Sequence, residues 1–277
     1  GYVGLADSHL LLHPDESRSE DENYAKAKAY AERALQIDDS PAEAHTSLAG
    51  INSLTWKWED AERNFQRAID LNPNYPTAHH WRGVLLQDLG RFDEALTSLK
   101  RAQELDPLSR VIGFARALVH LGKDDVTACI EQAKKTIDLD PNYYGGHAVL
   151  GHAYLKQRLY REALEELNRS FELSGNDSQM LGWLGYGHAV AGQRSKAFSV
   201  VKELEEKYRR QEAGGTEIAE VYIGLGDHDQ AFAWLDKDVQ ARRRRSLREI
   251  RTCWWIFGAV KSDPRYTSLL KYMGLSQ

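Results

Sequence analysis

The sequence of 277 residues predicts an all-α protein, a right-handed α-α superhelix of about seven helix-turn-helix repeats with a C-terminal capping helix. The prolines Pro73, Pro107 and Pro141 are 34 residues apart, and each closes a segment long enough for two helices. One small-residue position recurs with the same period and holds Ala27, Ala61, Ala95, Cys129, Ala163, Ala197 and Ala231. A period kept this long indicates a solenoid, because each repeat needs its neighbours to bury its apolar face.

The repeats can be placed in order along the chain. We expect an irregular first repeat at about 1–41, with helices over Tyr2–Leu12 and Tyr24–Ile37 and a polar loop, His13 to Asn23, between them. Six further repeats are predicted at 42–75, 76–109, 110–143, 144–177, 178–211 and 212–245, and the cap at 246–277. Each repeat holds two helices of about 12–14 residues. The prediction is therefore a single solenoid over 1–277.

Glycines recur at two positions of the repeat. Gly83, Gly151 and Gly185 share a first-helix position with Ala49, Ala117 and Ala219, where a larger side chain would push the helices apart. Gly90, Gly192 and Gly226 fall in the turn between the two helices, where left-handed backbone is useful. No strand pattern precedes any of them, so they do not indicate a phosphate-binding loop.

The chain after Asp238 departs from the repeat and predicts a cap over the last apolar face. An arginine run is followed by the apolar residues Trp254 to Phe257, then by Asp263-Pro264 as a helix start and Gly274 as a helix stop. Arg242, Arg243, Arg244 and Arg245 are candidate anion contacts. The favoured interpretation of this run is a solvated helix face paired with Asp236 and Asp238.

Composition limits the classes of function. The apolar fraction of 42% and charged fraction of 28% are typical of a folded, soluble protein, and no apolar run approaches the ~18–20 residues that span a membrane. A net charge of −5 argues against nucleic-acid binding by the whole chain. Two cysteines are too few for a disulfide framework, which fits a reducing compartment, and we expect a cytoplasmic location. Cys129 is interpreted as a packing residue.

The repeats resemble the tetratricopeptide family, through Leu150-Gly151, Leu184-Gly185, Tyr154, Ala61 with Phe65, and Pro73. The segments GLADSHLLL, AIDLNPNYPTAHHW, AQELDPLS and SDPRYTSLLKYMGL are more specifically similar to the C-terminal repeat region of bacterial winged-helix regulators, adenylate cyclases and serine/threonine kinases. This resemblance implies an effector domain before Gly1, since no motif of such a domain occurs in these residues. It also implies the alternative function, a sensory domain that regulates an attached effector in cis.

First helices line the concave face of such a superhelix, so their residues that packing does not require are the candidates for ligand contact. This rule predicts a groove that binds a peptide or partner protein through His80, Trp81, Phe114, Leu118, His152, Trp183 and Tyr186. Exposed apolar patches of this kind usually mark binding sites. The alternative is that Trp81 and Trp183 pack between neighbouring repeats. The sequence does not predict the partner or the oligomeric state.

Three other chemistries are disfavoured. Some tetratricopeptide domains clamp the terminal carboxylate of chaperone tails with Lys and Asn from these positions, which hold neither residue here. His45, His79 and His147 share one position, but successive repeats lie about 9–10 Å apart, too far for shared metal ligands. No nucleophile elbow or metal motif is present, so we predict no enzyme, no metal and no cofactor.

Overall fold

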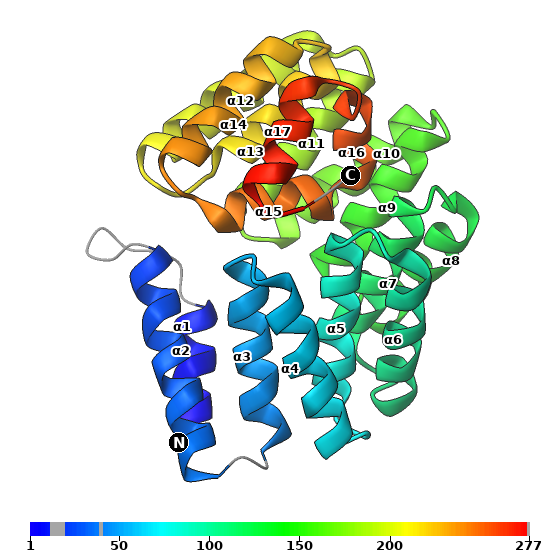
Figure 1. Ribbon diagram of the computed structural model, residues 1–277. Helices are drawn as coiled ribbons and strands as arrows, with labels where there is room; N and C mark the ends of the chain where they lie inside the picture. The colour runs from blue at the N-terminus through cyan, green and yellow to red at the C-terminus, as the bar shows by residue number, and fades with distance from the viewer. Residues whose placement is uncertain (12–19, 39–40, 276–277) are drawn as a thin grey trace. The chain divides into compact units, whose positions relative to one another are not determined.

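The computed structural model describes residues 1–11, 20–38 and 41–275, and in these ranges its secondary structure is helical (Figure 1). The chain forms two compact units, Gly1–Pro107 with Met273–Ser276 and Leu108–Tyr272. The predicted repeats run through this division with their period intact. The single solenoid over 1–277 stays a prediction.

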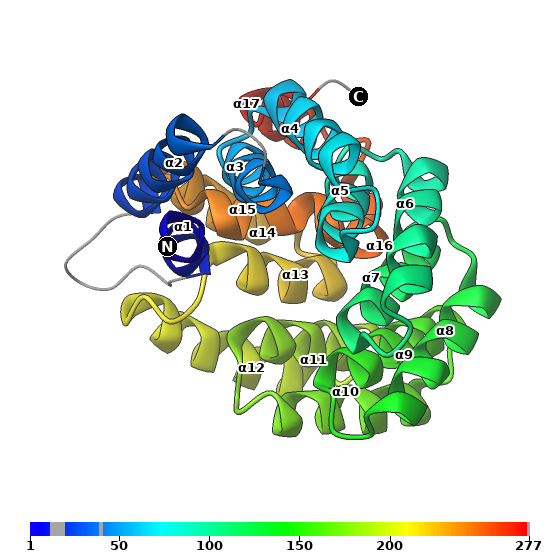
Figure 2. The same ribbon diagram turned by 90° about the horizontal axis from the view of Figure 1, so that it is seen from below.

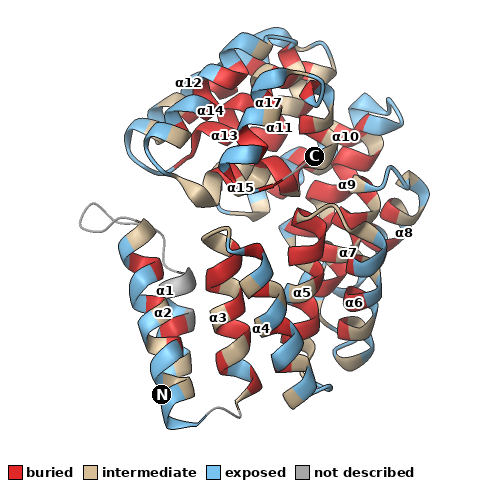
Figure 3. Ribbon diagram, viewed as in Figure 1, coloured by how far each residue is buried: buried red, intermediate tan, exposed pale blue. Residues whose placement is uncertain are grey.

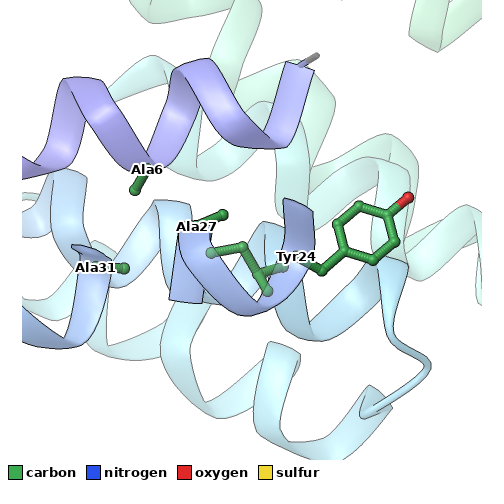
Figure 4. Close-up of a cluster of buried hydrophobic side chains, with 5 residues drawn as sticks. Ala6, Tyr24, Ala27 and Ala31 are labelled. Atoms are coloured by element: carbon green, nitrogen blue, oxygen red, sulfur yellow. The ribbon is translucent and has the colours of Figure 1, made fainter. Parts of the chain in front are cut away.

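Where the structure describes the first unit between residues 1 and 107, it contains three helix pairs. Their bounds are α1 Tyr2–Leu11 and α2 Glu20–Ile37, α3 Ala42–Leu54 and α4 Trp58–Leu71, and α5 Pro76–Asp88 and α6 Phe92–Leu105. Ala6 of α1, Tyr24, Ala27 and Ala31 of α2 and Ile51 of α3 form one buried cluster (Figure 4). The second helix begins at Glu20, earlier than the predicted Tyr24, because three acidic residues in its first turn favour the positive end of the helix dipole. Most of the predicted polar loop lies outside the described residues.

The second unit contains four helix pairs and the C-terminal helices. Its pairs are α7 Arg110–Gly122 and α8 Val126–Leu139, α9 Tyr144–Lys156 and α10 Tyr160–Leu173, α11 Ser178–Val190 and α12 Arg194–Arg209, and α13 Gly215–Leu225 and α14 His228–Gln240. They are followed by α15 Arg244–Thr252, α16 Trp254–Phe257, the 3₁₀ turn Gly258–Val260 and α17 Pro264–Tyr272. Each pair therefore falls within its predicted repeat.

Close helix crossings explain the recurring small residues. Ala27, Ala61, Ala95, Cys129, Ala163, Ala197 and Ala231 are all 0–1% exposed. A Cβ atom on Gly83 would lie 2.5 Å from Leu99 Cγ, and one on Gly151 would lie 2.7 Å from Leu167 Cγ. Both distances are shorter than van der Waals contact, so the predicted packing role of these glycines is confirmed.

The turn inside each repeat has left-handed backbone at one position, which is also spaced by 34 residues. Gly90, Gly192 and Gly226 hold it with φ of 77°, 76° and 77°, as predicted. In three other repeats the same position is held by Trp56, Asp124 and Arg158, with φ of 61°, 64° and 60°. The geometry of the repeat therefore dictates the backbone here even where the side chain disfavours it.

The first of the C-terminal helices covers the last repeat, as predicted, whereas the next one also reaches a first helix that lies further back in the array. The helix α15 packs against α13 and α14, and α16 packs against α13 and α7. Figure 2 shows α8, α10 and α12 along one side of the unit, with α13, α15 and α16 on the other side of α9 and α11. The last helix begins at Pro264 after Asp263, whose carboxylate accepts from the Arg265 backbone N–H at 2.9 Å, and Gly274 ends it with φ of 72°.

Candidate functional site

The first helices of the second unit are buried on most of their surface. In α9, nine of the 13 residues are buried, from Gly145 to Leu155, whereas only three of the 14 residues of α10 are (Figure 3). A helix at the surface of a protein buries only one face. The face of α9 that the sequence assigns to an open groove is therefore covered.

Trp255 of α16 covers part of this face. Its ring centroid lies 5.3 Å from that of His152 and 5.8 Å from that of Trp183, and its indole Nε1 donates a hydrogen bond to His152 Nδ1 at 3.1 Å. His152 also makes an edge-on contact with Trp183 at 5.0 Å and a tilted contact with Tyr186 at 5.8 Å. We call His152, Trp183, Tyr186 and Trp255 the aromatic cluster. Three of its members were predicted as groove residues, and Trp255 was predicted only as part of the cap.

The protonation state of His152 follows from its surroundings. The side chain is 0% exposed, and burial lowers its pKa to about 3, so the ring is neutral at pH 7. An indole N–H can only donate, so Nδ1 must be the accepting nitrogen and the proton sits on Nε2. That second nitrogen is buried and has no hydrogen-bond partner among the described residues.

Phe114 lies in an open pocket whose lining includes no residue of the aromatic cluster. The pocket has a volume of about 570 Å³ and is lined by Arg110, Val111, Phe114, Asp140, Asn142, Tyr143, Tyr144 and Leu173. Val111 and Tyr144 are 43% and 38% exposed, and Phe114 meets Tyr143 edge-on at 6.0 Å. Arg110 lies over the Tyr143 ring and pairs with Asp140 at 2.5 Å. This pocket thus offers apolar side chains and charged groups within one open concavity.

The other predicted groove residues are distributed as follows. Leu118 is 5% exposed and belongs to the core of the second unit. In the first unit, His80 is 8% exposed, and burial lowers its pKa to about 4, whereas its neighbour Trp81 is 37% exposed. The two rings of this pair are tilted against each other at 5.1 Å. Trp183 is 2% exposed, as the packing alternative expects, whereas Trp81 is 37% exposed; contact of either residue with a ligand stays a prediction.

Part of the arginine run has a structural role. Arg243 Nη1 donates to the Ala213 carbonyl at 2.6 Å, and its guanidinium lies over the Tyr208 ring at 4.2 Å. Arg244 and Arg245 are half-buried and have partners, and Arg242 is exposed with φ of 54°. The interpretation of this run as a solvated face is therefore wrong for Arg243, which holds the C-terminal helices to the preceding repeat.

Asp238 is a buried carboxylate and not the surface partner that the sequence suggested. It is 0% exposed, and its Oδ2 accepts from the backbone N–H groups of Gly215 and Thr216 at 2.7 and 3.2 Å and from Ser246 Oγ at 2.5 Å. These donors are the N-terminus of α13 and a side chain of α15. One carboxylate thus caps a repeat helix and ties the first C-terminal helix to it. The sequence offered no periodic signal for this role.

His79 and His147, which share one position of the repeat, make hydrogen-bond contacts to backbone carbonyl groups of the same chain. His79 Nε2 lies 2.9 Å from the Pro73 carbonyl oxygen. His147 Nε2 makes the same contact two repeats later, 3.0 Å from the Pro141 carbonyl oxygen. His147 Nδ1 also meets Glu166 at 2.7 Å. Among the described residues no three His, Cys, Asp or Glu side chains are grouped as a metal site would require.

Comparison with known proteins supports the fold and the type of repeat. A tetratricopeptide repeat model matches residues 57–110 and 83–144. Anaphase-promoting complex subunit 7 of Dictyostelium discoideum is 31% identical over 194 residues, which cover 69% of this chain and 33% of that protein. Anaphase-promoting complex subunit 3 of Schizosaccharomyces pombe is 23% identical over 163 residues, covering 59% of this chain and 24% of that protein. The chain thus spans a third or less of these two relatives.

A solved structure points to the same fold. The structure described as a functional characterization of Pseudomonas aeruginosa pilF superposes with a TM-score of 0.59 and 22% identity, covering 79% of this chain and 94% of that one. The prediction of an all-α solenoid of this type is confirmed, and such repeats typically belong to non-catalytic scaffolds. In the ranges that the structure describes, no helix is both long and apolar enough to cross a membrane.

Proposed function

Because residues 57–144 carry tetratricopeptide repeats, we propose that the chain is a protein-interaction module that binds a peptide segment of a partner protein. The observation that carries this proposal is the open pocket around Phe114. It combines partly exposed apolar side chains with polar and charged groups, which is how recognition sites for peptides are built.

The lining residues suggest how a peptide would bind. Phe114 and Tyr144 offer aromatic surface to one apolar side chain of the ligand, and Val111 adds to this apolar lining. Arg110, whose side chain is 54% exposed, remains accessible to a carboxylate or carbonyl oxygen of the ligand despite its pairing with Asp140. The size and lining of the pocket suit a short extended peptide that buries one apolar side chain better than they suit a large flat interface.

A selection of short random peptides on the purified chain tests this proposal. We expect selected peptides to bind with a Kd in the micromolar range and Phe114→Ala to weaken them by at least about tenfold, as loss of a buried aromatic contact does. Phe198→Ala is the matched control, because Phe198 is also a partly exposed phenylalanine but stands on the second helix α12. The proposal is contradicted if the two substitutions weaken binding equally. It is also contradicted if no peptide can be selected on a chain that far-UV circular dichroism shows to be folded.

A second proposal is regulation in cis of an attached effector domain. It rests on the resemblance of the four quoted segments to repeat regions of bacterial signalling proteins. The coding sequence upstream of Gly1 tests it directly, because a cyclase, kinase or winged-helix pattern there supports the proposal and its absence refutes it.

A further inference from the structure

The contacts of Trp255 depend on the chemistry of an indole ring. His152 Nδ1 is a buried acceptor, and the Trp255 Nε1–H is the donor that satisfies it at 3.1 Å. The same ring makes aromatic contacts with His152 and Trp183. A phenylalanine at this place would leave the acceptor unsatisfied, which is costly for a buried polar atom. Covering an apolar face alone would not require such a matched donor and acceptor.

The backbone around Trp255 is anchored independently of its side chain. Cys253, Ile256 and Phe257 are each 0% exposed, and the Arg251 guanidinium lies 3.7 Å from the centre of the Trp254 ring. Trp255 itself is only half-buried. Part of its ring therefore already faces solvent, while the buried neighbouring side chains hold the short helix α16 in place.

From this geometry we propose that His152, Trp183 and Tyr186 form an indole-binding site, which Trp255 closes in cis and which a tryptophan-bearing segment of a partner protein occupies by exchange. This site lies apart from the pocket around Phe114, so the inference goes beyond the peptide binding proposed there. We assign a tryptophan side chain as the occupant because the site already holds the indole ring of Trp255. Tethering makes Trp255 a strong competitor, because its effective concentration at the site is of millimolar order or higher.

The test uses the full chain with Trp255→Ala and the probe N-acetyl-L-tryptophanamide. We expect the variant to bind the probe with a Kd of about 0.1–1 mM, as a fragment-sized ligand does. The wild-type chain should bind at least about tenfold more weakly, because Trp255 must first lose its hydrogen bond and ring contacts. The 1-methylindole analogue of the probe lacks the N–H donor, and we expect it to bind the variant about tenfold more weakly than the probe.

Two further variants keep the test decisive. Trp254→Ala removes the adjacent indole, whose ring packs on the Arg251 guanidinium, and leaves the Trp255 donor to His152 in place, so this control should bind the probe no better than the wild-type chain. Trp255→Leu replaces the alanine variant if circular dichroism shows that the latter does not fold. The inference is overturned if the probe fails to bind a folded Trp255 variant, if its methylated analogue binds equally well, or if Trp254→Ala has the same effect.

Discussion

Replacing the buried Asp238 by asparagine should remove a pH-dependent part of the stability of the second unit. The asparagine keeps an oxygen that accepts from the Gly215 N–H, but it cannot ionise. Burial raises the pKa of Asp238 from 3.8 to about 7, against the opposing effect of its hydrogen bond from Ser246. Glu217, also buried, raises this pKa further, and Arg243 lowers it. Asp238 is therefore largely protonated in the folded chain at mildly acid pH.

The size of the effect follows from the two pKa values. A carboxyl group whose pKa is higher in the folded than in the unfolded chain holds its proton more tightly when folded. Its contribution to stability is then complete below about pH 4 and is lost as the pH rises to about 7. Linkage gives a loss of about 2–3 kcal/mol in the free energy of unfolding between about pH 5 and about pH 8. The asparagine variant lacks this loss.

Urea unfolding followed by far-UV circular dichroism at several pH values measures the effect. Subtracting the unfolding free energy of Asp238→Asn from that of the wild-type chain removes the effect of the other carboxyl groups, which titrate in both. This difference should fall by about 2–3 kcal/mol between about pH 5 and about pH 8. Asp236→Asn is the matched control, because Asp236 is exposed on the same helix, and its curve should run parallel to that of the wild-type chain. If the curve of Asp238→Asn is parallel as well, Asp238 is not the buried acid described above.

Three further outcomes are expected. Arg158→Gly should raise the free energy of unfolding by about 0.5–1 kcal/mol, because φ of 60° strains an L residue. Gly192→Ala, at the equivalent position of a later repeat, should lower it by about 1 kcal/mol for the same reason. Urea unfolding midpoints measure both changes, and changes of the opposite sign would refute the reasoning. Gly151→Ala should lower it by about 1–3 kcal/mol, since the new methyl group lies against Leu167, and a melting temperature equal to that of the wild-type chain would contradict this crossing. Burial raises the pKa of Cys129 to about 12, so both cysteines, which are 0% exposed, should resist a thiol reagent at neutral pH until denaturant is added, and rapid labelling of the native chain would be inconsistent with their packing.

The candidate sites were predicted unevenly from the sequence, for a physical reason. The repeat period identified His152, Trp183 and Tyr186 as one group, and the structure brings their rings together. It could not identify Trp255 as their partner, because the contact joins residues 103 positions apart and is made once, by a segment outside the repeat. Asp238 was missed for the same reason, since its role depends on the α15 residue Ser246. The sequence also could not predict which first-helix side chains are exposed to solvent, because this depends on which other segments pack over each helix.

The sequence by itself determined the helix pairs, their period, the small residues at the crossings and the left-handed turn inside each repeat. All of these depend on interactions between near neighbours in the chain, which every repeat makes again and which therefore leave a periodic pattern. Only the tertiary structure decided which first-helix residues stay accessible, because the C-terminal helices fold back over α13 and α7 through contacts that occur once. Phe114 thus remains in an open pocket, whereas His152 is closed over by an indole ring from the end of the same chain.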